Sequence, residues 1–155
     1  MLNRQKRQRG FSLIELLIVI AIILIIIMIA VPKYNAAQRF ARETAAIGAI
    51  RTIHTMEVQY YSQYGKYATD LKELGPPTSG APSPAAADLI DSKLAGGETG
   101  GYKFILSANA GGYQINANPV TFGVTGARTF YSDQSMVLRQ NYGQEPATAN
   151  SPEAK

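Results

Sequence analysis

The sequence contains no cysteine, which excludes disulfide bonds and thiolate metal sites. A fold without these crosslinks must be held together by packing and hydrogen bonds alone. The absence of cysteine does not decide the compartment, because an exported chain can also fold without disulfides. Acidic residues are missing from the first ten positions, which hold Arg4, Lys6, Arg7 and Arg9.

The rest of the chain has no excess of charge of either sign. Four of the 15 Lys and Arg residues lie in the first ten positions, so 11 basic residues remain against 11 Asp and Glu. The pI near 9.4 therefore comes from the N-terminal segment. A chain that is neutral elsewhere lacks the broad basic surface that phosphate backbones require, so no nucleic-acid partner is expected.

Apolar residues are concentrated in one segment directly after the basic positions. The 21 residues from Phe11 to Val31 would extend about 31 Å as a helix, close to the thickness of a bilayer's hydrocarbon core. The basic segment in front orients the N-terminus toward the cytoplasm. Pro32 follows and cannot donate a hydrogen bond to the carbonyl of Met28. This predicts a helix kink at Pro32.

Beyond Pro32 the helical pattern continues in amphipathic form as far as Tyr64, and Gly65 follows as a stop signal. The pattern predicts one helix of about 50 residues whose second half covers a sheet. The predicted buried stripe consists of Ala37, Phe40, Thr44, Ile47, Ile50, His54, Val58 and Tyr61. Charged residues fall mostly beside this stripe, namely Arg39, Arg42, Glu43, Arg51 and Glu57.

The remaining chain shows shorter periods. Asp70 to Leu74 predicts a brief helix with Asp70 at its start, and residues 95–101 predict a flexible glycine-rich loop. Alternation of period two then predicts four antiparallel strands over 102–107, 113–118, 128–133 and 136–140. The fold class is therefore α+β. The expected parts are a leader at 1–10, a membrane helix at 11–32, an amphipathic helix at 33–64, a sheet-bearing head at 65–142 and a disordered polar tail at 143–155.

The border between the basic and apolar segments carries the most specific motif. It reads Arg9-Gly10-Phe11-Ser12-Leu13-Ile14-Glu15-Leu16-Leu17 and resembles the cleavage-and-methylation signature of type IV prepilins and type II secretion pseudopilins. The resemblance implies cleavage between Gly10 and Phe11 by a membrane prepilin peptidase, followed by N-methylation of Phe11. Glu15 becomes the fifth mature residue and Pro32 the twenty-second, as in that family.

Glu15 is a functional-site candidate on physical grounds as well. A carboxylate within a membrane helix costs up to about 2.5–3.5 kcal/mol at the centre and less near an end. Cleavage would create a partner, because a free α-amine at Phe11 has a typical pKa near 8 and is mostly cationic. The sequence allows either this amine or that of a neighbouring subunit to pair with Glu15, and the resemblance favours the neighbour. The plain alternative is a signal anchor with a stray carboxylate.

The resemblance implies a structural subunit of a type IV pilus or pilus-like filament, stored in the inner membrane and polymerised through its N-terminal helix. Its expected partners are further copies of itself, minor pilins, the prepilin peptidase and methyltransferase, and an inner-membrane assembly platform. A type II secretion pseudopilin is the alternative, and a DNA-uptake pilin that binds nucleic acid is a weaker one. The expected location changes from the inner membrane to a periplasm-spanning or surface filament.

No enzymatic activity, cofactor or metal is expected, because no nucleophile–base pair or metal-ligand pattern stands out. His54 is interpreted as a packing residue of the helix. Asp88, Asp91 and Glu98 have a spacing that matches no known calcium loop, so a solvated acidic rim is the preferred interpretation.

Overall fold

A computed structural model describes residues 10–109 and 111–154, so the predicted leader lies outside the described residues except for Gly10. The chain divides into two compact units, Met1–Ala36 and Ala37–Lys155. We call the first unit the anchor and the second the head. Helix α1, Leu13–Tyr64, begins in the anchor and ends in the head, which confirms the single long helix predicted from the sequence.

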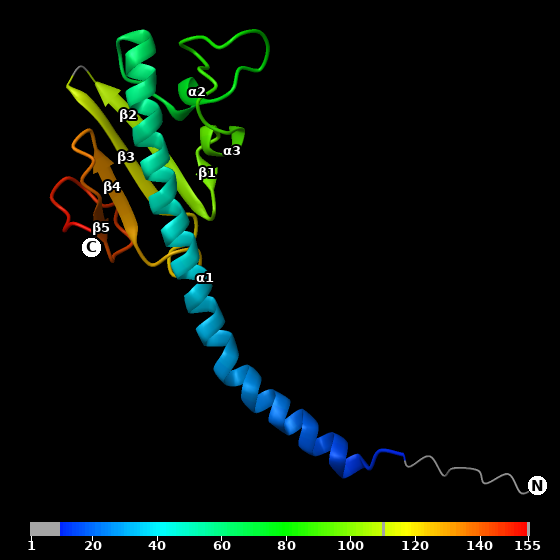
Figure 1. Ribbon diagram of the computed structural model, residues 1–155. Helices are drawn as coiled ribbons and strands as arrows, with labels where there is room; N and C mark the ends of the chain where they lie inside the picture. The colour runs from blue at the N-terminus through cyan, green and yellow to red at the C-terminus, as the bar shows by residue number, and fades with distance from the viewer. Residues whose placement is uncertain (1–9, 110, 155) are drawn as a thin grey trace, which may run out of the picture. The chain divides into compact units, whose positions relative to one another are not determined.

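The head contains an antiparallel sheet with the strand order β1-β2-β3-β4-β5 (Figure 1). The strands are β1 Glu98–Thr99, β2 Tyr102–Asn109, β3 Gly112–Pro119, β4 Thr129–Asp133 and β5 Arg139–Asn141. This confirms the α+β class and adds a fifth strand to the four predicted. The addition arises in the loop predicted to be flexible, where Gly100 and Gly101 both have positive φ, at 61° and 82°. This backbone forms a tight two-residue turn that pairs Thr99 with Tyr102.

Two short helices connect α1 to the sheet. Helix α2, Leu71–Leu74, begins after Asp70, whose side chain accepts a hydrogen bond from the backbone N–H of Lys72 at 2.9 Å. This confirms the predicted helix start at Asp70. Helix α3, Ser92–Ala95, is capped in the same way by Asp91. One of the three acidic residues weighed as calcium ligands therefore has a structural role in capping.

The face of α1 that covers the sheet differs from the predicted stripe. Phe40, Val58 and Tyr61 are exposed, at 66%, 52% and 49% of their surface, and Ala37 and Thr44 are exposed as well, so the prediction was wrong for these five residues. The buried stripe is rotated around the helix and includes Glu43 and Glu57, which the sequence predicted to lie beside it. The buried α1 residues are Glu43, Ala46, Ile50, Ile53, His54, Glu57 and Tyr60. The rotation is possible because residues outside α1 supply partners for Glu43 and Glu57.

The C-terminal tail is ordered in the described residues, which corrects the expectation of disorder. Ala147 is 1% exposed, and its carbonyl accepts a hydrogen bond from the side chain of Asn116 at 3.0 Å. The tail also binds the last strand through its backbone. The two contacts are Gln140 N–H to Pro152 O at 2.9 Å and Ala154 N–H to Leu138 O at 2.8 Å. Composition could not reveal this order, because mainly backbone groups hold the tail.

His54 lies in a buried chain of hydrogen bonds, which confirms its interpretation as a packing residue. Its Nδ1 is 2.7 Å from the Tyr113 hydroxyl, and its Nε2 is 2.8 Å from Oγ of Ser132. Ser132 donates its own proton to the carbonyl of Val137 at 3.0 Å, so it must accept from His54. Nε2 therefore carries a proton, and in the neutral imidazole the Tyr113 hydroxyl donates to Nδ1. Burial lowers the pKa of His54, which agrees with this assignment.

Glu57 is buried one helical turn after His54 and is only partly satisfied. The side chain is fully covered, and its Oε2 accepts the backbone N–H of Ala68 at 3.1 Å. Its Oε1 has no hydrogen-bond partner among the described residues. Burial raises the pKa of Glu57 to about 7, and the nearby charge of Glu73 acts in the same direction. In the folded head, about half of the Glu57 carboxyl is therefore protonated near neutral pH, whereas a free carboxyl would be ionised.

We expect Glu57→Gln to stabilise the head at alkaline pH. Because the pKa of Glu57 is raised on folding, its contribution is fully present below about 4.5 and is lost as pH rises through about 7. The loss amounts to roughly 3 kcal/mol in the free energy of unfolding. The neutral amide of the variant imitates the protonated acid, so the variant should gain most of this at pH 8 and little at pH 4. Urea unfolding of the full chain in detergent micelles, at several pH values, measures it.

The matched control is Glu98→Gln, which removes a carboxylate at an exposed position. His54 has the opposite effect, because its pKa is lowered and its contribution to the free energy of unfolding is lost as pH falls. This effect is the same in all three proteins. The difference between the wild type and Glu57→Gln therefore isolates Glu57. Equal pH slopes in these two proteins would contradict the assignment.

Candidate processing and assembly site

The predicted cleavage bond directly precedes α1. Gly10 and Phe11 are exposed, Phe11 at 85% of its surface, and the helix begins two residues later at Leu13. A side chain added at Gly10 would meet no atom within 4 Å. The fold therefore does not require glycine at this position. A requirement for glycine here would have to come from a partner protein that binds this segment. Cleavage of the bond between Gly10 and Phe11 stays a prediction.

Glu15 has a local partner at the start of the helix. Its Oε2 accepts the backbone N–H of Ser12 at 2.8 Å, and Ser12 Oγ lies 3.4 Å from the N–H of Ile14. This is a capping box, in which two side chains satisfy free donors of the first helical turn. Sequence reasoning missed Ser12, although the spacing Ser-x-x-Glu was the available signal. The structure thus brings Glu15 to the helix start, where the helix dipole also favours a carboxylate.

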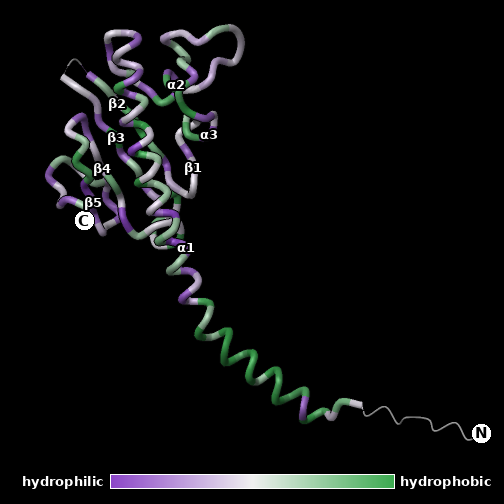
Figure 2. Tube along the Cα trace, in the orientation of Figure 1, coloured by the Kyte–Doolittle hydropathy of each residue, from purple (hydrophilic) through white to green (hydrophobic). Residues whose placement is uncertain are grey.

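The apolar part of α1 is uncovered in the structure. Figure 2 shows a continuous hydrophobic stretch along the N-terminal half of this helix. Its large apolar side chains from Leu13 to Val31 are all exposed by at least 45%. By length and composition, α1 is able to cross a membrane. An uncovered surface of this size is unfavourable in water, so it fits a lipid environment or a protein partner.

The other site predictions have different outcomes. Helix α1 continues through Pro32 without interruption, and the kink at Pro32 stays a prediction. Within the described residues, no group of three His, Asp or Glu side chains is arranged to hold a metal ion.

Two comparisons match the N-terminal part of the chain. Residues 5–31 match the family model described as the prokaryotic N-terminal methylation motif. Over 69 residues the chain is 35% identical to the type IV major pilin protein PilA of Myxococcus xanthus (strain DK1622), covering 44% of this chain and 31% of that protein. No solved structure matches the chain significantly.

A methylation motif, a long apolar helix and an antiparallel sheet are together consistent with the α+β fold of pilins. Over its N-terminal part, the chain is thus similar to type IV pilins and matches a prokaryotic N-terminal methylation motif. The matched segment spans about a third of the length of the curated relative.

Proposed function

We propose that the chain is a structural subunit of a type IV pilus or pilus-like extracytoplasmic filament. The observation that carries this proposal is the uncovered apolar half of α1, which lies within the matched methylation motif. Before assembly this surface lies in the inner membrane, with the leader on the cytoplasmic side. During assembly it exchanges lipid contacts for contacts with neighbouring helices, while the head stays outside the membrane.

Glu15 and the new N-terminus supply the recognition step of this proposal. Removal of residues 1–10 leaves a cationic α-amine at Phe11, and methylation keeps its charge. The Glu15 carboxylate of one subunit pairs with the amine of a subunit already in the filament. Because the paired surfaces differ, each addition exposes a new copy of the first surface, and the assembly grows head to tail without closing. Pro32 supplies the local loosening that lets the helix adapt.

The proposed partners follow from this life cycle. The chain is a substrate of a prepilin peptidase and methyltransferase, and it then associates with an inner-membrane assembly platform. Further copies of the chain form the filament, together with minor pilins. The mature protein is located in the inner membrane before assembly and in a periplasm-spanning or surface filament afterwards. No nucleic acid is among the partners, because the chain after residue 10 carries equal numbers of basic and acidic residues.

A pseudopilin of type II secretion is the second candidate, since the same N-terminal motif serves both classes. The lack of cysteine supports the pseudopilin candidate, because the C-terminal disulfide loop of many type IV pilins cannot form in this chain. Deletion of the gene distinguishes the two. A pilus subunit is required for sheared surface filaments, whereas a pseudopilin is required for protein secretion. If the chain instead acts in DNA uptake, deletion of the gene should abolish DNA uptake and leave both surface filaments and protein secretion intact.

Processing is the first testable consequence. We expect the intact mass of the membrane-inserted chain to correspond to residues 11–155 with one added methyl group. Gly10→Val should block cleavage and leave the full chain in the membrane, because a branched side chain would obstruct the bond presented to the peptidase. Gly48→Ala is the matched control, since Gly48 also has no atom within 4 Å of an added Cβ. A wild-type chain that still starts at Met1 would disprove the assignment.

A further inference from the structure

The sheet face that turns away from the core carries an unusual row of amide side chains. Along β3, Tyr113, Ile115 and Ala117 are buried, so the alternating residues Gln114, Asn116 and Asn118 point to the opposite, outer face. The strand register extends this pattern sideways. Ser107 and Asp133 lie beside Gln114, and Ile105 and Tyr131 lie beside Asn116.

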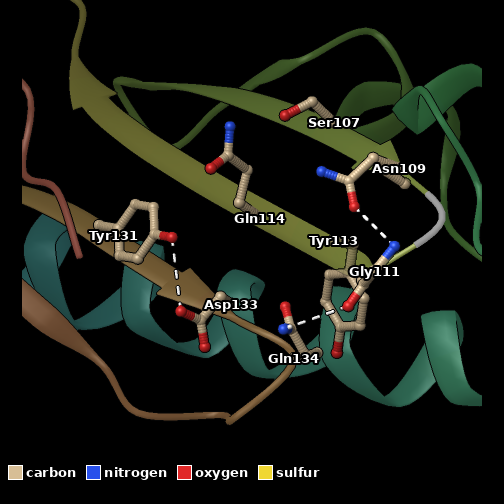
Figure 3. A pocket seen from close by; sticks show the side chains of 10 residues that line it. Ser107, Asn109, Gly111, Tyr113, Gln114, Tyr131, Asp133 and Gln134 are labelled. Carbon is tan, nitrogen blue, oxygen red and sulfur yellow. Dashed lines mark hydrogen bonds between the residues drawn. The ribbon is translucent and has the colours of Figure 1, made fainter.

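Two hollows follow this row and share the residues Gln114 and Tyr131. The first has a volume of about 390 Å³ and is lined by Ser107 and Asp133 as well (Figure 3). The second has about 430 Å³ and is lined by Asn116, Asn118 and residues 146–149 of the C-terminal tail. We call the two hollows together the amide groove. Volumes of several hundred Å³ are typical of small-molecule sites.

The C-terminal tail forms one wall of the amide groove and is fixed to the sheet. Asn116 Nδ2 donates to the carbonyl of Ala147 at 3.0 Å, and Thr129 Oγ1 donates to the carbonyl of Glu145 at 2.9 Å. Ala147 is consequently buried against the sheet. The groove is therefore a built feature of the folded head and depends on the ordered tail.

Several polar groups of the groove have no protein partner. Within the described part of the chain, the side-chain amide of Gln114, the Ser107 hydroxyl and the side-chain oxygen (Oδ1) of Asn116 make no hydrogen bond. Asp133, in contrast, is occupied, because it accepts two hydrogen bonds from Ser135 and one from Tyr131. The hydrogen bonds from Ser135 hold the pKa of Asp133 below its usual value. The groove thus offers free neutral donors and acceptors next to one carboxylate.

This chemistry selects a class of ligand. No Lys or Arg is among the described residues that line either hollow. Lys103 and Arg139 flank the row beside Asn118 and Tyr131, and Arg139 donates to the carbonyl of Ser151 at 2.9 Å. Phosphate or carboxylate groups would therefore find no counter-charge inside the groove itself. One carboxylate is too few for a divalent cation. The groove lies on a sheet face and not on an edge, so an added peptide strand would find no free backbone groups. Amides donate and accept at once, as sugar hydroxyls do. We infer that the amide groove binds a neutral oligosaccharide chain.

Binding by one chain does not depend on filament assembly. Only the strength of adhesion rests on the proposed function, because a filament would repeat the groove and multiply a weak affinity through multivalency. A test on single chains therefore separates the two ideas. Failure of sugar binding would leave the filament role intact, and failure of assembly would leave the groove intact.

The experiment is an NMR titration of the ¹⁵N-labelled full chain in detergent micelles with cellotetraose and maltotetraose. We expect saturable amide shifts in β3 and at Tyr131 with at least one of them, and a dissociation constant on the order of 1 mM. Gln114→Ala should weaken binding about tenfold, because it removes two hydrogen bonds at an exposed position. Glucose should bind more weakly, since it fills only part of the groove, and tetragalacturonate should not bind.

Gln63→Ala is the control, an exposed glutamine on α1 whose loss should leave the titration unchanged. The absence of saturable shifts with both neutral tetrasaccharides would overturn the inference and leave an ordinary solvated sheet face. Equal affinity in wild type and Gln114→Ala would overturn the assignment to the groove. Binding of tetragalacturonate as tight as that of the neutral sugars would overturn the ligand class.

Discussion

Cells that produce only the Glu15→Gln chain should process it and retain it in the membrane, but their yield of sheared filaments should fall by about two to three decades. Glutamine can take the place of Glu15 in the capping box with Ser12, so the start of α1 is preserved. The charge that would pair with a neighbour's α-amine is lost. Loss of one partner from a desolvated charge pair costs about 3–5 kcal/mol, which accounts for this reduction in the association constant.

Two further variants separate the capping role of Glu15 from its proposed assembly role. Ser12→Ala removes the hydroxyl from the capping box and keeps the carboxylate, so filament yield should stay near that of the wild type. Glu15→Leu removes both functions and should fail at least as severely as glutamine, while wild-type chains in the same cell should partly rescue it. The measurement pairs the membrane level of processed protein with filament yield from the same culture. A normal filament yield from Glu15→Gln cells would show that Glu15 only caps the helix of a membrane anchor and has no role in assembly.

Arg128→Ala should destabilise the head by about 3–5 kcal/mol. Glu43 is 6% exposed and accepts hydrogen bonds from the Arg128 side chain at 2.9 Å and from the backbone N–H of Ala127 at 2.8 Å. Arg128 also donates to Gln140 at 2.8 Å and lies 5.4 Å from the centre of the Phe130 ring. Alanine would leave the buried carboxylate without its cation, which is the costly outcome for such pairs. Urea unfolding of the full chain in micelles, followed by tyrosine near-UV dichroism, gives the free energy.

The double variant Glu43→Gln with Arg128→Met tests the cause of that loss. It removes both charges and keeps most of the volume, so it should be clearly more stable than Arg128→Ala alone. Arg51→Ala is a control at an exposed position of the same helix and should change the stability by less than about 0.5 kcal/mol. If the double variant is as unstable as Arg128→Ala, the lost packing of the arginine explains the effect and the unpaired carboxylate does not.

The features that sequence reasoning predicted correctly depend on neighbouring residues. The long helix of α1 follows from unbroken helical periodicity, the start of α2 follows from Asp70, and most of β2 to β4 follows from alternating side chains. The motif around Gly10 and Glu15 is also local, and the family model matches there. Each of these signals operates within a few residues, because helical turns, caps and strand pleats are short-range structures.

The features that sequence reasoning placed wrongly depend on contacts between different elements of the fold. The burial of Glu43 requires Arg128, 85 residues later, and the burial of Glu57 requires the backbone of Ala68. The tail was predicted to be disordered from its polar composition, yet Asn116 and strand β5 hold it in place. By itself, the sequence thus determined the anchor, the processing motif and the fold class. Only the tertiary structure decided which face of α1 is buried and where the tail lies, because a polar group's burial depends on a partner that only folding brings near.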